Sequence, residues 1–231
     1  FMENKLWADR LYLILSSIFI ASLVSCNLIF QKFFEMSIYV PFLGEYTFEQ
    51  SVGLLPYPIT FIVTDIISEI YGRRKANQVV TSGLFASLFM LLIVTVSDMV
   101  SATSWSPVSD TIFSKVFGLS AAAVFASMIA YLVAQYIDVR VFHFWKNLTR
   151  GKHLWLRNNA STIFSQFIDT FAVLFLLCFL DVLAWDRFST LLINGFLFKV
   201  FFAAFDTPII YVIIYFIRRK FNLEFGQELK H

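Results

Sequence analysis

Charged side chains are scarce in this sequence: Asp, Glu, Lys and Arg together make up only 15% of its 231 residues. Soluble domains carry about 25% charged residues, so a chain that folds entirely in water is excluded. The net charge of +2 offers no strong basic field, and we therefore expect no nucleic-acid partner.

Residue types that bind metals or perform catalysis are also few. The chain has three histidines and two cysteines, and Cys26 and Cys178 lie in separate apolar segments without metal-ligand spacing. No Gly-rich loop ending in Lys-Ser/Thr is present, so any ATP-driven step would need another polypeptide. We expect no metal, no cofactor and no catalytic residues.

Apolar residues, in contrast, reach 58% of the chain, and 29 residues are phenylalanine. They gather in runs long enough for a helix to cross a hydrocarbon core, which takes about 20 residues. The six runs are Leu11–Phe34, Val52–Tyr71, Val79–Val100, Leu119–Val141, Ala160–Leu180 and Leu191–Ile217. None shows the two-residue alternation of a barrel strand. The sequence predicts an all-α fold, an integral membrane bundle of six transmembrane helices in a single domain over residues 1–231.

Two shorter features complete this outline. Phe1 precedes Met2 and is set aside as an expression remnant. The segment Ser101–Lys115 is the longest connection on its side of the membrane and mixes Ser, Asp and Trp, so we expect a short interfacial helix or a lid there.

Lys and Arg are distributed unevenly among the connections between the runs. The N-terminus, the second and fourth connections and the C-terminus hold fourteen of them, whereas the alternate connections hold only Lys32, Lys115 and Arg187. Basic residues accumulate on the cytoplasmic side of membrane proteins. We therefore expect a multi-pass protein with both termini in the cytoplasm.

Polar and ionisable residues nevertheless recur inside five of the six runs. An ionisable group at bilayer depth costs about 2.5–3.5 kcal/mol on insertion scales, so such groups generally face a cavity or a partner. Spacings of three and four residues place them in stripes on the predicted helices, which indicates a polar cavity inside the bundle. The candidate substrate-binding residues are Asn27, Gln31, Thr64, Asp65, Glu69, Gln135, Ser161, Thr162, Gln166, Asp169, Thr170 and Lys199.

Structural roles are an alternative explanation for some of these residues. Lys199 can simply neutralise Asp169 or Asp65, and hydroxyl groups can join helices through hydrogen bonds. Asp65 and Glu69 can anchor the basic cluster Arg73–Lys75 at the end of their helix. For the deeper pair, Asp169 and Lys199, we favour a function in binding.

Proline and glycine interrupt two of the runs. Two prolines lie in the segment Gly53–Pro58, and Pro208 lies within the last run. Interrupted spans often frame transporter binding sites, because freed backbone groups can meet the solute. The second and fifth runs also have similar centres, Phe61–Asp65 and Phe167–Thr170. Since a three-helix unit repeated in tandem must insert in opposite orientation, an inverted three-plus-three repeat is a hypothesis.

Several short blocks occur in order from the first run to the last. They are Asn27 with Gln31, Pro58–Asp65 with Tyr71-Gly72, Gln135–Phe142, Leu154–Leu156 with Ala160–Thr162, Asp169-Thr170, and Phe198-Lys199. Each block is weak alone, but together they resemble the family of queuosine precursor transporters, also called the vitamin uptake transporter family. The resemblance covers nearly the whole chain.

The resemblance implies import of a precursor for the queuosine modification of tRNA, the 7-cyano- or 7-aminomethyl-7-deazaguanine base, across the bacterial inner membrane. Such a base is flat and presents N–H donors on one edge, which a carboxylate can accept. We expect Asp169 to be the main acceptor and Lys199 to hold its charge and geometry. Phe or Tyr rings are expected to stack on the faces of this purine-like substrate.

Two alternatives from other classes stay open at this point. The chain can be the substrate-binding membrane subunit of a vitamin transporter driven by separate ATPase subunits, because Ser17, Ala21 and Ser25 form a small-residue stripe that suits a partner helix. It can also be an intramembrane aspartyl enzyme that uses Asp65 and Asp169, although we expect no enzyme activity. A homodimer in the lipid bilayer is a further option that the sequence does not decide.

Overall fold

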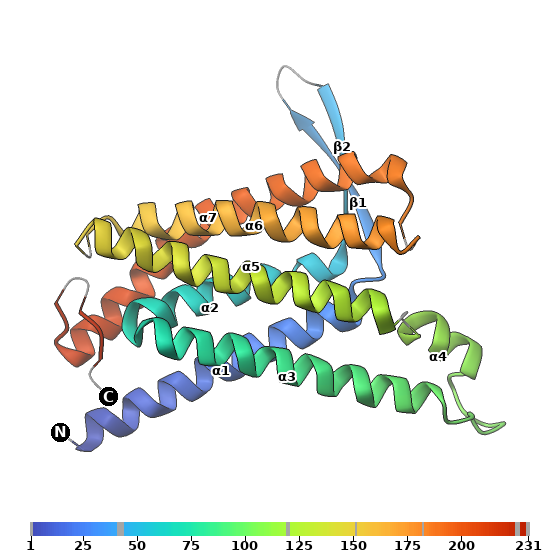
Figure 1. Ribbon diagram of the computed structural model, residues 1–231, viewed down its shortest axis with the longest axis horizontal. Helices are drawn as coiled ribbons and strands as arrows, with labels where there is room; N and C mark the ends of the chain where they lie inside the picture. The colour runs from blue at the N-terminus through green and yellow to red at the C-terminus, as the bar shows by residue number, and fades with distance from the viewer. Residues whose placement is uncertain are drawn as a thin grey trace.

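The computed structural model of the chain describes residues 2–40, 44–118, 121–150, 152–181, 183–224 and 227–229. Its elements in chain order are α1 (Met2–Ile29), β1 (Phe33–Val40), β2 (Gly44–Ser51), the 3-10 helix η1 (Val52–Leu54), α2 (Tyr57–Ile70), α3 (Gly72–Asp98), α4 (Asp110–Phe117), α5 (Ala121–Leu148), α6 (Leu154–Phe179) and α7 (Trp185–Phe221). The long helices lie lengthwise beside one another (Figure 1). Both chain termini lie at one end of the bundle, here called the termini end, and β1 and β2 rise from the other, the hairpin end (Figure 1).

Helix α2 is the centre of the bundle. All of its residues except Ile59 and Ile62 are buried, and it packs against α1, α3, α5 and α7. It is short because Pro56 and Pro58 interrupt the chain before its first full turn, and Gly72, with a φ of 80°, reverses the chain into α3 after its last. Helix α2 thus belongs to the run Val52–Tyr71, in which the sequence predicted an interruption by glycine and proline.

The outer helices present apolar side chains away from the bundle. On α6, Phe167, Phe171, Phe175 and Phe179 form a ladder of stacked rings that is more than 40% exposed at each position. Exposed apolar surface of this extent is stable in lipid and unfavourable in water. Within the described residues, five segments are long and apolar enough to cross a membrane: Lys5–Ile29, Val52–Ile70, Gly72–Asp98, Leu154–Phe179 and Trp185–Phe221.

The prediction of an all-α fold is wrong between the first two helices. The predicted helix Leu11–Phe34 ends at Ile29, and residues 33–51 form an antiparallel hairpin whose strands pair from Phe33↔Ser51 to Val40↔Gly44. The reason is a two-residue period in β2, where Tyr46, Phe48 and Gln50 face the bundle and the residues between them are more exposed. A β-strand with one buried face satisfies that period and a helix does not.

The hairpin is attached to α7 by specific contacts. The Tyr46 hydroxyl donates to Asn194 Oδ1, and the Phe48 ring stacks on Phe198 with 6.0 Å between ring centroids. A short helix was expected within Ser101–Lys115, and α4 begins in that segment, where the Ser109 side chain caps its first turn. Helix α7 extends beyond both ends of the predicted run Leu191–Ile217 and continues through Pro208.

Candidate functional site

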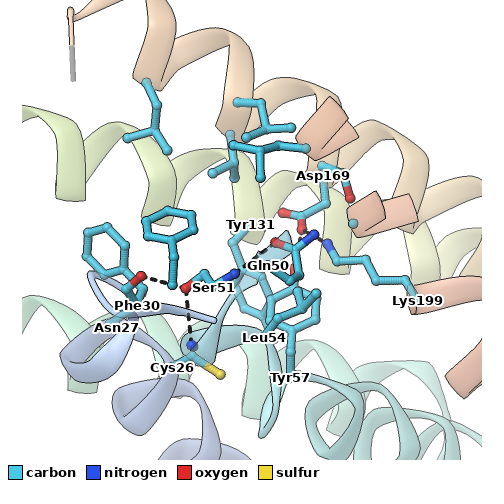
Figure 2. A pocket seen from close by; sticks show the side chains of 18 of the residues that line it. Cys26, Asn27, Phe30, Gln50, Ser51, Leu54, Tyr57, Tyr131, Asp169 and Lys199 are labelled. Atoms are coloured by element: carbon cyan, nitrogen blue, oxygen red, sulfur yellow. Dashed lines mark hydrogen bonds and ion pairs between the residues drawn. The ribbon is translucent and has the colours of Figure 1, made fainter. Parts of the chain in front are cut away.

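A cavity of about 180 Å³ lies inside the hairpin half of the bundle, and Figure 2 shows the side chains around it. Its walls come from α1, β1, β2, η1, α2, α5, α6 and α7, and they are mainly apolar. The polar residues of the wall are Asn27, Gln50, Ser51, Tyr57, Tyr131, Asp169, Thr170 and Lys199. A cavity of about 150 Å³ accommodates a benzene ring, so this one has the size of a small planar heterocycle.

Asp169 is held in place by two other side chains of the cavity wall (Figure 2). Its Oδ2 accepts a hydrogen bond from Lys199 Nζ at 2.7 Å and a second one from the Tyr57 hydroxyl. Lys199 Nζ also lies 4.2 Å from the centroid of the Tyr57 ring, which adds a cation–π contact. These three buried side chains come from α6, α7 and α2, so the interaction ties three helices together. A buried carboxylate is tolerated here because its charge is paired and hydrogen-bonded.

The second carboxylate oxygen, Asp169 Oδ1, is buried and has no hydrogen-bond partner in the part of the chain that the structure describes. A buried acceptor without a donor is costly, and most such atoms in folded proteins are satisfied. Because Asp169 lines the cavity, this oxygen is available to a ligand that brings an N–H group.

Gln50, at the end of β2, reaches the same cavity and was missed by the sequence analysis. Its Oε1 accepts from the backbone N–H of Ser51 at 3.0 Å, and its buried Nε2 has no partner among the described residues. Gly195 on α7 makes room for it, since a Cβ there would lie 3.0 Å from Gln50 Nε2 and 3.2 Å from Thr170 Cγ2. The signal that could have found Gln50 is the alternation of Tyr46, Phe48 and Gln50, but all three lie outside the apolar runs.

Aromatic rings form part of the cavity wall. Tyr57 and Tyr131 meet edge to face with centroids 5.4 Å apart, and the Tyr131 hydroxyl accepts from Gln135 Nε2 at 2.6 Å. Phe30, in the turn after α1, and Phe33, at the start of β1, also line the cavity. Such rings offer flat faces on which a planar ligand can stack.

The structure brings four of the twelve predicted residues into this cavity: Asn27, Thr170, Asp169 and Lys199. Asn27 Nδ2 donates to Ser87 Oγ at 3.4 Å, and Thr170 Oγ1 donates to the carbonyl of Gln166 at 2.7 Å. Gln31 does not reach the cavity: it is exposed in the turn after α1 because that helix ends at Ile29.

Six further predicted residues are buried on α2, α5 and α6, further toward the termini end. Together with Asp138 and Ser165 they form what we call the polar band: Thr64, Asp65, Gln135, Asp138, Ser161, Thr162, Ser165 and Gln166. Ser165 Oγ donates to Asp138 Oδ1 at 3.0 Å, which connects α6 to α5. Thr64 Oγ1 is instead bonded to carbonyls of its own helix, those of Thr60 and Phe61.

Glu69, the remaining predicted residue, lies near the termini end among other charges. Arg218 donates to its Oε1, and Lys146 Nζ lies 3.6 Å from its Oε2 and 2.8 Å from Glu228 Oε1. We call Glu69, Lys146, Arg218 and Glu228 the charge cluster. The sequence suggested Arg73–Lys75 as partners, whereas these cations come from α5 and α7. The backbone N–H of Leu229 donates to the carbonyl of Ile70 at 2.8 Å, so the segment around Leu229 packs against α2.

Apolar helices around a mainly apolar cavity that carries a few polar and aromatic side chains define a class, that of membrane transporters which bind a small solute within the bundle. The particular family follows from comparison with known proteins. Residues 51–213 match the sequence model of the family described as "Putative vitamin uptake transporter", and the chain belongs to this family.

Three curated relatives extend the comparison. A "Probable queuosine precursor transporter" of Bacillus subtilis (strain 168) is 28% identical over 70% of this chain and 70% of its own length. One with the same name from Haemophilus influenzae is 27% identical over 81% of this chain and 79% of its own length. The "Queuosine precursor transporter" of Escherichia coli (strain K12) is 27% identical over 56% and 55%. No solved structure shows a significant match.

Proposed function

We propose that the chain is a membrane transporter that imports a queuosine precursor, a 7-substituted 7-deazaguanine, across the bacterial inner membrane. The names of the three relatives support the substrate class. The observation that carries the proposal in this chain is Asp169, whose Oδ2 is held by Tyr57 and Lys199 while its Oδ1 is left without a described partner at the cavity. An acceptor held in this way suits the ring N–H of a deazaguanine.

The charges of the cavity favour the neutral 7-cyano base over the 7-aminomethyl base. Asp169 and Lys199 are the charged residues of the described cavity wall, and they pair with each other at 2.7 Å. A cationic aminomethyl group would find no unpaired carboxylate in the described cavity wall with which to form an ion pair. Burying an unpaired charge is costly. The 7-cyano-7-deazaguanine base carries no such charge.

A membrane orientation with both termini in the cytoplasm agrees with the distribution of basic residues, fourteen on one side against three on the other. We propose six spans: the five apolar segments and α5, a 28-residue helix that packs against α6. In this orientation the cavity lies in the outer half of the membrane and the charge cluster lies at the cytoplasmic side. The polar band between them is then the path along which the substrate passes inward.

The inverted three-plus-three repeat remains a proposal within this arrangement. Helices α1 and α2 connect at the hairpin end, whereas α5 and α6 connect at the termini end, as opposite orientation requires (Figure 1). The described residues between α5 and α6, 149–150 and 152–153, form no hairpin of this kind. Superposition of Met2–Asp98 on Ala121–Phe221 tests the repeat, and failure of the three helices to align would end it.

The direct test is uptake of 7-cyano-7-deazaguanine into liposomes that contain the purified chain as the sole protein. We expect saturable uptake that is lost in Asp169→Asn and retained in Asp181→Asn, a matched change in the exposed turn after α6. Binding without uptake would favour the alternative of a subunit driven by separate ATPases. Absence of both would reject the proposed function.

The structure weighs against an aspartyl enzyme, and we do not propose one. Two catalytic aspartates must lie close enough to share a proton. Asp169 instead bonds to Lys199 and Tyr57 at the cavity, while Asp65 belongs to the polar band. Mass measurement of the detergent-solubilised protein would distinguish a homodimer from a monomer.

A further inference from the structure

Gln50 is held in one orientation by its neighbour. The backbone N–H of Ser51 is a donor, so the side-chain atom of Gln50 that meets it at 3.0 Å must be the amide oxygen. The amide nitrogen is therefore the end that is left without a described partner, and it can only donate.

The segment that carries Gln50 is itself well anchored. Ser51 Oγ donates to the carbonyl of Phe30 at 2.5 Å and accepts from the backbone N–H of Gly53 at 3.1 Å. A Cβ at Gly53 would lie 2.7 Å from the carbonyl oxygen of Cys26, so the glycine permits η1 to contact α1 closely. This local structure fixes where the Gln50 amide enters the cavity (Figure 2).

The cavity wall thus holds a buried donor, Gln50 Nε2, and a buried acceptor, Asp169 Oδ1, and neither has a described partner. Each atom lost its water on burial, which is unfavourable until a partner replaces it. A ligand offsets both losses when it carries an acceptor next to a donor. A carbonyl beside a ring N–H, the lactam edge, has that pattern.

We propose that Gln50 is a specificity-determining residue that donates to the ring carbonyl of the substrate while Asp169 Oδ1 accepts from the adjacent ring N–H. This inference rests on the proposed function, because it assigns the oxygen and the N–H of a deazaguanine to two atoms of the same cavity. It identifies the substrate class as lactam heterocycles. A base in which a poorer acceptor replaces the carbonyl loses the hydrogen bond from Gln50 and keeps the one to Asp169.

The test compares 7-cyano-7-deazaguanine with its 6-thio analogue, which keeps the ring N–H and exchanges the carbonyl oxygen for the weaker acceptor sulfur. Binding of both is measured to wild type, Gln50→Glu and Gln50→Met by calorimetry in detergent. Gln50→Glu keeps an oxygen for the Ser51 N–H but removes the donor, and Gln50→Met removes the donor without adding charge. Gln31→Met, in the exposed turn after α1, is the matched control.

We expect wild type and Gln31→Met to bind the oxo base about tenfold more tightly than the thio analogue. In both Gln50 variants we expect the affinity for the oxo base to fall by about tenfold, so that the oxo base and the thio analogue bind equally well. An unchanged preference in monodisperse Gln50 variants would overturn the inference while leaving the proposed function intact. Equal binding of the two ligands by wild type would overturn it without any variant, and no binding of either would reject the proposed function instead.

Discussion

The two ends of the bundle deal with buried polar groups in opposite ways. At the hairpin end, Asp169 Oδ1 and Gln50 Nε2 lack described partners and border a cavity of about 180 Å³. At the termini end, Glu69 faces Arg218 and Lys146, and Lys146 Nζ also lies 3.2 Å from the Glu69 carbonyl. Buried polar groups that pair with one another stabilise the folded membrane protein. Buried polar groups beside a cavity can instead pair with a ligand. The comparison predicts that substitutions at one end alter binding and substitutions at the other alter stability.

The largest effects are expected at the Asp169–Lys199 pair. Asp169→Asn removes the charge that Lys199 and Tyr57 hold, and Lys199→Ala leaves a carboxylate buried without its cation. We expect each change to reduce uptake of 7-cyano-7-deazaguanine by more than about a hundredfold while the protein still inserts. Lys115→Ala, at an exposed lysine of α4, is the matched control. Uptake within twofold of wild type in either variant would reject the role of the pair.

Glu69→Gln probes the other end of the comparison. Both cations of the charge cluster are buried, and after the change Glu228, which pairs with Lys146, is the one carboxylate of the cluster left to balance two cations. We expect the free energy of unfolding to fall by about 3–5 kcal/mol and the affinity for the substrate to change by less than about threefold. Thermal unfolding in detergent and calorimetry measure the two quantities.

An exposed pair provides the control for Glu69. Arg187 and Glu49 lie 3.3 Å apart at the hairpin end with 59% and 38% of their side chains exposed. Glu49→Gln should therefore cost at most about 1 kcal/mol. A larger loss of stability from Glu49→Gln than from Glu69→Gln would contradict the contrast between the two ends.

Competition between the two precursor bases sharpens the description of the cavity. Because its two described charges cancel, we expect the neutral 7-cyano base to displace a bound ligand at least about tenfold more effectively than the cationic 7-aminomethyl base. The measurement is a displacement titration at one pH and salt concentration. A preference for the 7-aminomethyl base would mean that another carboxylate pairs with its ammonium group in the cavity.

Among the substitutions at the cavity, Gly195→Ala should have the smallest effect on binding. A Cβ at this position would lie 3.0 Å from Gln50 Nε2, so the amide must shift slightly, and we expect affinity to fall by about threefold to tenfold. Gly195 lies within α7, where alanine favours the helix by about 0.5–1 kcal/mol. Weaker binding without loss of thermal stability would locate the effect at the cavity. Unchanged binding would show that the Gln50 side chain can shift without affecting the ligand.

Individual residues explain how far sequence-based prediction reached. Asp169 and Lys199 were recognised because a charge in an apolar run needs a partner, and the structure pairs them. Gln50 and Tyr57 were missed, and Gln50 lies on a strand that the prediction left out. Gln31 was placed on a helix because the apolar run continues past the residue at which α1 ends.

The amino-acid sequence by itself determined the membrane helices and the polar character of their interior, because hydropathy and charge act on each segment separately. The tertiary structure decided which polar atoms meet. Side chains from eight elements line the cavity, and those of the charge cluster come from α2, α5, α7 and the chain that follows. Contacts between side chains of different elements depend on how the helices pack and where the hairpin folds back. Residue spacing within one segment does not contain that information.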